Sequence, residues 1–154
     1  MTLFANGFVT IITPQDFNHI PNKGDFVELS LINPKIPMTI KFSTTPTMVG
    51  LPDIKNAIEE QLESNPNINV QTTDFIAIND DIYYMVISSI TTKESQIKRN
   101  EFMFVKDNNL YSFEFTYPYA DAELDNFYLD IIRSMKIRKA KYLLTDDGYT
   151  INED

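Results

Sequence analysis

Residues 97–117 read IKRNEFMFVKDNNLYSFEFTY and carry the strongest structural pattern in the chain. Two alternating apolar runs flank Asp107-Asn108-Asn109, a sequence that tolerates the positive φ angles of a tight turn. We predict a β-hairpin with Asn108 and Asn109 at its centre, which places Phe104 opposite Phe113. Moving the turn back by one residue keeps the same faces, because side chains alternate along a strand. In either register one face carries six aromatic residues: Phe102, Phe104, Tyr111, Phe113, Phe115 and Tyr117.

This hairpin closes a longer run of predicted strands. Apolar runs at about 70–78, 82–91, 97–105 and 110–117 are separated by short polar segments. Segments of this length join neighbouring antiparallel strands. We therefore predict a four-stranded antiparallel meander.

The residues after the meander predict an amphipathic helix over about 121–135. Asp121 suits the N-terminus of a helix, and Arg133 suits the negative C-terminal end. The helix and the aromatic face of the hairpin would each expose a large apolar area if left alone, so we expect the helix to cover that face. Its apolar stripe consists of Leu124, Phe127, Tyr128, Ile131, Ile132 and Met135.

The first half of the chain predicts three strands and one thin helix. Alternating apolar residues indicate strands at about 8–12, 27–31 and 38–42. A helix over about 52–64 begins at Pro52, where a proline loses no helical hydrogen bond. Its apolar stripe is narrow, so we expect it on the edge or outer face of the sheet.

Together these elements predict an α+β fold. We expect a single antiparallel sheet, made of about three N-terminal strands plus the four-stranded meander, with both helices packed on it. Residues 1–137 are predicted to form one domain. Residues 138–154 are predicted to form a charged and mobile tail.

The charge and composition exclude several classes of function. The 154 residues include 22 acidic and 13 basic ones, a formal net charge of −9, and such a surface repels nucleic acid and anionic lipid headgroups. Cysteine is absent, which excludes disulfides, thiol nucleophiles and thiolate metal sites. The N-terminus lacks the charged start and apolar core of a secretory signal, and no apolar run is long enough to span a bilayer. We expect a cytoplasmic protein.

Few residues are placed for catalysis or metal binding. His19 is the one histidine of the sequence, and it lies in a polar segment without a nucleophile motif nearby. The pairs Asp80-Asp81 and Asp146-Asp147 lack the alternating spacing of a calcium loop, so we interpret them as turn and tail residues. We therefore predict no catalytic residue, no cofactor and no metal, and we expect that the protein is not an enzyme.

The second face of the predicted sheet is the candidate binding surface. Residues 82–90 are apolar at both alternating positions, so this strand should be covered on both sides. An under-covered apolar face with pliable methionines is typical of a protein-binding groove. An equally good interpretation is that the helix at 52–64 and the loop at 44–50 cover this face completely. The candidate partner-binding residues are Met85, Ile87, Met103 and Val105.

The order of elements resembles the PsbP/Mog1/DcrB-like superfamily of small α+β domains over roughly residues 3–137. Members of that superfamily are mostly non-catalytic binding or assembly factors, and the resemblance implies the same for this chain. The resemblance is carried by Tyr83-Tyr84, the polar turn Thr91–Gln96, the strand Leu110–Tyr117 and the helix end Ile131–Ile137.

One branch of that superfamily is similar in its N-terminal residues. Met1–Phe4 and Thr13-Pro14 resemble the effector-associated chaperones of type VI secretion, and Asp16-Phe17 stands where that branch commonly has a Gly-Trp pair. The resemblance implies a chaperone that shields hydrophobic segments of its clients.

These observations predict a cytoplasmic, non-catalytic protein-binding module, such as an adaptor, chaperone or immunity-type factor. It would hold a partner segment on an apolar sheet face. The expected partner is a protein, with a homodimer as a further option and no nucleic acid. An alternative is a carrier of a small apolar ligand in a closed pocket between sheet and helix.

Overall fold

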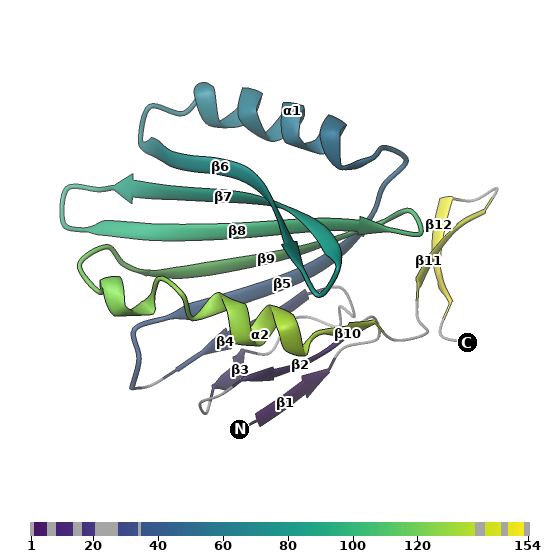
Figure 1. Ribbon diagram of the computed structural model, residues 1–154, viewed down its shortest axis with the longest axis horizontal. Coiled ribbons are helices and arrows are strands. Elements are labelled where there is room, and N and C mark those ends of the chain that lie inside the picture. Colours follow the sequence, from purple (N-terminus) through teal and green to yellow (C-terminus); the bar gives the residue numbers. More distant parts are fainter. Residues whose placement is uncertain are drawn as a thin grey trace.

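The structure is a computed structural model (Figure 1). It describes residues 2–5, 9–13, 17–20, 28–33, 35–137, 141–145 and 148–152. The elements are, in chain order, β1 (Thr2–Ala5), β2 (Val9–Thr13), β3 (Asn18–Ile20), β4 (Glu28–Ile32), β5 (Thr39–Pro46), α1 (Leu51–Glu63), β6 (Ile68–Ile78), β7 (Asp81–Thr91), β8 (Gln96–Lys106), β9 (Asn109–Pro118), the 3₁₀ turn η1 (Ala122–Leu124), α2 (Tyr128–Ser134), β10 (Lys136–Ile137), β11 (Lys141–Thr145) and β12 (Gly148–Asn152).

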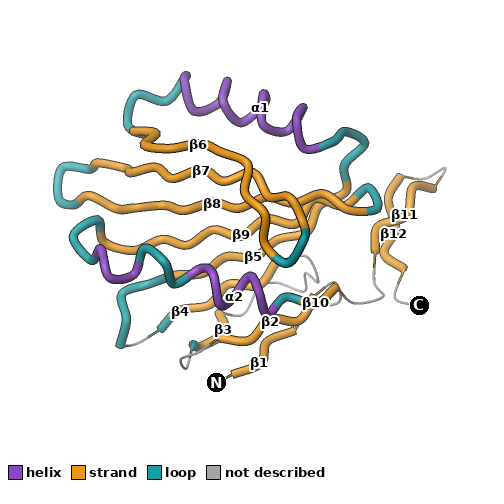
Figure 2. Tube along the Cα trace, viewed as in Figure 1, coloured by secondary structure: helices purple, strands orange, loops and turns teal. Residues whose placement is uncertain are grey.

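The main sheet has seven antiparallel strands in the order β3-β4-β5-β9-β8-β7-β6 (Figure 2). The predicted α+β class and the four-stranded meander, which is β6 to β9, are confirmed. The prediction of a single sheet is wrong in one respect, because residues 9–13 lie outside the main sheet. They form β2, which pairs with β1 and β10 in a small second sheet. This small sheet forms because the chain returns to β2 after α2. The local periodicity of the sequence does not indicate such a long-range pairing. β11 and β12 pair with each other as a hairpin.

The hairpin between β8 and β9 has the second of the two registers that keep the aromatic residues on one face. Asp107 and Asn108, at φ 51° and 63°, are the central turn residues, one position before the Asn108-Asn109 turn of the first register. Both central residues of this turn type need positive φ, and an Asp-Asn pair tolerates it. Phe104 consequently faces Tyr111 instead of Phe113.

The aromatic face of β8 and β9 is the centre of the core. Phe102 stacks on Tyr128 with ring centroids 4.2 Å apart, and Ile131 and Ile132 of α2 are buried against the same cluster. The second sheet closes this core from another side, because Val9 and Ile11 are also fully buried. The predicted packing of the C-terminal helix on the aromatic face is confirmed.

The predicted helix over 121–135 is interrupted. Residues 122–124 form the 3₁₀ turn η1, and the α-helix starts only at Tyr128. The interruption coincides with Asp125, whose carboxylate is bound by Lys98 and Tyr117 of the sheet. Backbone bonds of the tighter i→i+3 type, such as Asp125 N–H to the carbonyl of Ala122, run through this segment.

The helix α1 lies on the opposite face of the main sheet, as its thin stripe predicts. Ile54 is buried against Tyr84, Val86 and Met103 of β7 and β8. The other residues of its stripe, Ile58 and Leu62, are half-buried. The helix therefore covers only part of this face.

The core contact of α2 can be tested by truncating Ile131, which is fully buried. Ile131→Ala is expected to lower the free energy of unfolding by about 2–5 kcal/mol, because it leaves a cavity beside the aromatic face. Urea unfolding followed by circular dichroism measures this loss. Asp130→Ala, at an exposed position of the same helix, is the control and should change the stability little. Equal effects of both substitutions would contradict the packing.

Candidate functional site

The four residues chosen from the sequence do not share one face of the sheet. The register pairs Tyr84 with Met103 and Met85 with Phe102, so the two methionines point to opposite sides. Met85 and Ile87 pack against the aromatic core, whereas Met103 and Val105 pack in the cluster beneath α1. The shared apolar face inferred from the sequence is therefore not formed, because both parities of these strands are apolar and the register alone assigns them. Met103 is only 4% exposed.

An apolar surface lies instead at the N-terminal end of α1. Four large hydrophobic side chains from two segments are exposed there: Met48 (70%), Val49 (47%), Phe75 (40%) and Ile82 (54%). A surface depression of about 470 Å³, which we call the apolar hollow, is lined by Gly50, Leu51, Pro52, Phe75, Asp80, Asp81, Ile82, Phe104 and Val105. Of the residues predicted from the sequence, Val105 lies in this lining.

The tight turn of the β6–β7 hairpin positions two apolar side chains that line the hollow, Phe75 and Ile82. Asn79 and Asp80 have φ angles of 53° and 68°, which makes a two-residue turn between Ile78 and Asp81. Ile82 follows this turn directly. The prediction of a turn residue is confirmed for Asp80, whereas Asp81 is the first residue of β7. Both aspartates line the hollow.

The ring of Phe75 packs against β7 and is only partly exposed to solvent. Its centroid is 5.5 Å from that of Tyr84, whose hydroxyl donates to Glu59 of α1 at 3.2 Å. Burial raises the pKa of the Tyr84 hydroxyl, so this group remains a donor. The contact fixes Phe75 on the α1 side of the sheet. Sequence reasoning missed Phe75 because its position beside Tyr84 depends on the register between β6 and β7.

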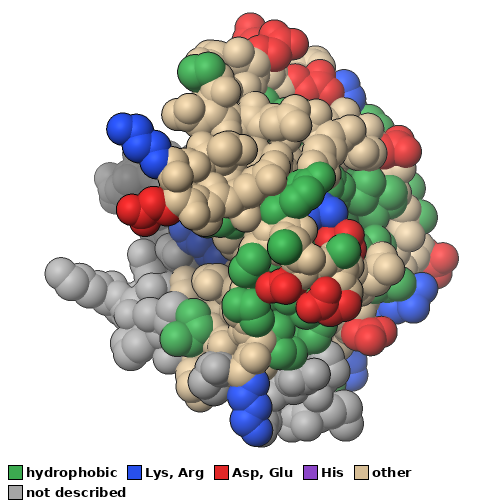
Figure 3. All heavy atoms as spheres, turned by 90° about the vertical axis from the view of Figure 1, so that its left-hand side faces the viewer, with side chains coloured by type: hydrophobic (Ala, Val, Ile, Leu, Met, Phe, Trp, Pro, Cys, Tyr) green, Lys and Arg blue, Asp and Glu red, His purple; other side chains and the backbone are tan. Residues whose placement is uncertain are grey.

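The outer side of α1 is acidic. Asp53, Glu59, Glu60 and Glu63 line a depression of about 460 Å³ along the outer side of α1. Figure 3 shows acidic side chains at the top of the molecule, where the C-terminal end of α1 lies. Lys55 pairs with Glu59 at 2.9 Å, and the hydrogen bond from Lys55 lowers the pKa of that carboxylate. The other three carboxylates leave a negative surface along this side of α1.

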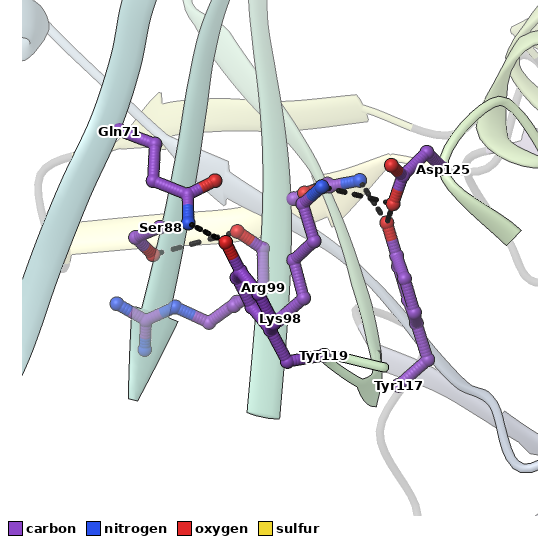
Figure 4. A network of polar contacts seen from close by, with 8 residues as sticks. Gln71, Ser88, Lys98, Arg99, Tyr117, Tyr119 and Asp125 are labelled. Atoms are coloured by element: carbon purple, nitrogen blue, oxygen red, sulfur yellow. Dashed lines mark hydrogen bonds and ion pairs between the residues drawn. The ribbon is translucent and has the colours of Figure 1, made fainter. Parts of the chain in front are cut away.

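A partly buried polar network lies on the opposite face, at the other end of β8 and β9 (Figure 4). Asn100 donates to the hydroxyl of Tyr117 at 2.9 Å, and Tyr117 donates to Asp125 at 2.5 Å. Lys98 donates to the same carboxylate oxygen at 2.9 Å. The network holds the segment after β9 on the sheet.

The ionisation of this network suits a structural role. Burial raises the pKa of Tyr117 above its usual value, so the hydroxyl stays protonated and cannot act as a base. Burial also raises the pKa of Asp125, but the hydrogen bonds from Tyr117 and Lys98 outweigh it and lower the pKa. The carboxylate is therefore charged at neutral pH and occupied by two donors.

A second charged group lies on the α1 side of β8 and β9. Arg99 pairs with Glu101 at 2.8 Å and approaches Glu114 at 3.8 Å. Glu101 and Glu114 face each other across the two strands. Burial raises the pKa of Glu101, and Arg99 opposes this shift. Arg99 thus offsets two neighbouring carboxylates within the sheet surface.

The structure does not describe the other candidate side chains that were singled out in the sequence. The side chain of His19, in β3, and the residues Asp146 and Asp147 lie outside the described parts. Within the described ranges no group of three or more histidine or carboxylate side chains is arranged to hold a metal ion. Neither α1 nor α2 combines the length and hydropathy of a bilayer-spanning helix, and the described residues contain no other candidate.

Comparisons with known proteins bear on the fold. No protein-family model and no curated protein matches the chain. Among solved structures, CyanoP, the cyanobacterial PsbP from Synechocystis sp. PCC 6803, superposes with a TM-score of 0.66 over 88% of this chain and 91% of its own, at 6% identity. LpqN of Mycobacterium tuberculosis, involved in cell envelope biogenesis, superposes with a TM-score of 0.58 over 84% and 82%, at 10% identity. The chain has the PsbP/Mog1/DcrB-like fold.

Two further similar structures are longer than this chain. The apo immunity protein TplEi of the type VI secretion system from Pseudomonas aeruginosa has a TM-score of 0.55 at 11% identity, over 71% of this chain and 43% of its own. TplEi has also been solved in complex with a peptide named "L". A Bacteroides thetaiotaomicron structure has a TM-score of 0.61 at 15% identity, over 92% of this chain, which spans about half (52%) of that protein. These similarities show the fold. The function is inferred below from the geometry of the candidate site.

The charge of Asp125 can be tested through the pH dependence of stability. Because its folded pKa lies below the ordinary value of 3.8, ionised Asp125 stabilises the fold at neutral pH, and this contribution is lost as the pH falls through the lowered pKa. Asp125→Asn should therefore be less stable than the wild type at pH 7, and the gap should shrink below about pH 4. Urea unfolding at several pH values measures it, with Asp130→Asn as the exposed control. A gap that does not change with pH would contradict the role of the charge.

Proposed function

We propose that this protein is a non-catalytic, cytoplasmic protein-binding module, an adaptor, chaperone or immunity-type factor that holds a segment of a partner protein. The observation that carries the proposal is the apolar hollow, with Phe75 and Ile82 exposed on one side and Met48 and Val49 beside it. The binding surface thus differs from the four-residue face inferred from the sequence.

The arrangement of the hollow supports a protein partner. Single exposed apolar residues are normal, but several from separate segments around one depression are typical of an interaction surface. Met48 adds an unbranched side chain that adapts to irregular partners. A protein with this fold, TplEi, binds a peptide, which agrees with such a role for the fold.

The polar groups support a non-catalytic role. Tyr117 is protonated, Asp125 is occupied by two donors, and Arg99 is paired with carboxylates. Each of these groups ties one element of the fold to another. None of them lines the apolar hollow.

The packing of α1 argues against a small-ligand carrier. The space between this helix and the sheet is filled by Ile54, Tyr84, Val86 and Met103, which are buried against one another. A ligand in a closed pocket there would have to displace these side chains. The open hollow at the end of the helix suits a peptide segment better.

The proposal can be tested by placing a charge in the hollow. Phe75→Asp and Ile82→Asp should each lose a stoichiometric partner that the tagged wild-type protein captures from its native cell lysate. An unpaired carboxylate on an apolar surface is costly to bury against a partner. Circular dichroism should show that both variants remain folded, because the positions are exposed.

Leu3→Asp is the matched control, since Leu3 is an exposed hydrophobic residue on β1. This variant should retain the partner. If all three variants keep the partner, or if all three lose it, the hollow is not the binding surface.

A further inference from the structure

The strand β6 lies at the edge of the main sheet. In the described part of the chain β6 has a strand neighbour, β7, on one side only. It is 11 residues long, and most of its side chains are exposed. A free strand edge offers unpaired backbone N–H and C=O groups that an extended peptide can bind.

The register identifies which residues of β6 offer those groups. The two-residue turn makes Ile78 and Asp81 a hydrogen-bonded pair, and such pairs then alternate along an antiparallel ladder. The residues between them point their backbone groups away from β7. These residues are Thr73, Phe75 and Ala77.

One hydrogen bond supports this assignment independently. The backbone N–H of Phe75 donates to the side chain of its neighbour Asp74 at 2.8 Å, so it takes no part in the ladder with β7. The Asp74 carboxylate thus occupies one donor of the free edge. An incoming strand would have to displace it.

The side chains beside the edge favour a particular type of strand. Thr73 and Phe75 lie on the α1 side of β6, because they pair with Val86 and Tyr84. A depression of about 470 Å³ between α1 and β6 is lined by Glu59, Leu62, Glu63, Asn65, Pro66, Ile68, Val70 and Thr73. Alternate side chains of an added strand would lie next to this mixture of apolar and acidic groups.

The charges beside the edge are predominantly negative. Glu59 and Glu63 lie on the α1 side, and Asp74 lies on the edge itself. Lys55 is paired with Glu59 and offsets one of these charges. Lysine and arginine suit this surface, since their alkyl chains pack on Val70 and Leu62 while their charged ends meet the carboxylates.

We infer that the partner of the proposed function binds as an added β-strand along Thr73, Phe75 and Ala77, and that this segment alternates lysine or arginine with apolar residues. The inference rests on the proposed function and deepens it. The apolar hollow receives residues at one end of the same segment, because Phe75 lines the hollow and also belongs to the edge.

The test uses a synthetic peptide of alternating lysine and valine, acetylated and amidated, about eight residues long as in an ordinary strand. Its binding to the full-length protein is measured by isothermal titration calorimetry. A glutamate–valine peptide of the same length should bind at least about tenfold more weakly, because it carries the wrong charge. Equal binding of the two peptides would overturn the assignment of a basic partner.

N-methylated peptides separate strand addition from other modes of binding. Alternate N–H groups of an added strand face β6, so methylating one alternate set should weaken binding by about tenfold or more, and methylating the other set should not. If both methylated peptides bind alike, the peptide is not an added strand. Absence of binding of the unmodified peptide at millimolar concentration would also overturn the inference.

A matched pair of protein variants tests the edge from the other side. Ala77→Pro removes one outward N–H without touching the β6–β7 ladder, and should weaken lysine–valine peptide binding by about tenfold. Ala77→Gly keeps the N–H and should bind like the wild type. Equal affinities of the two variants would contradict strand addition.

The results also distinguish this inference from the proposed function. If the peptide tests fail while Phe75→Asp and Ile82→Asp still lose the native partner, the hollow binds by another geometry and the proposed function stands. Sedimentation velocity of the wild-type protein gives the remaining outcome. If the wild type forms a dimer that Ala77→Pro abolishes, the occupant of the edge is a second copy, and the basic partner segment is excluded.

Discussion

Burial of the aromatic face of β8 and β9 is the constraint on which the rest of the structure depends. Phe102 packs between Phe115 and Tyr128, at centroid distances of 6.0 and 4.2 Å. A one-residue slip of either strand would turn these rings toward α1, so the aromatic core fixes the alternation of the meander. It thereby decides that Met103 and Val105 face α1.

The same constraint explains why a binding surface is left over. The helix α2 and the strand β2 pack on the aromatic core, and among the described helices and strands α1 is the one that packs on the other face. Its stripe of Leu51, Ile54, Ile58 and Leu62 covers the centre of that face, over β7 and β8. The strand β6 and the end of its hairpin extend beyond the helix, which exposes Phe75 and Ile82.

The parts of the fold that local patterns determine could be predicted from the sequence. The meander follows from alternating apolar runs and turns, and the residues of α2 that enter the core, such as Ile131 and Ile132, follow from helical spacing. The pairing of β2 with β10 could not be predicted, since these strands lie far apart in the chain and contact through the path of α2. The position of the turn at Asp107 was ambiguous by one residue, and both choices gave the same faces.

The candidate site was harder to predict for a related reason. Strands that are apolar at both parities do not reveal their register, so Met85 and Met103 could be placed on one face or on two. The hollow also arises where α1, β8 and the β6–β7 hairpin meet, and none of these segments marks it alone.

The edge of β6, where we propose that the partner binds, carries two features that limit non-specific pairing. An unprotected edge of this length would pair with any other strand, including its own copy. The register shift between Val70 and Thr72 and the capture of the Phe75 N–H by Asp74 both make indiscriminate pairing less favourable. Each device weakens every incoming strand by a similar amount, whereas Glu59 and Glu63 favour only a positively charged one. Backbone protection and side-chain charge together therefore convert a general hazard into selectivity for one kind of segment.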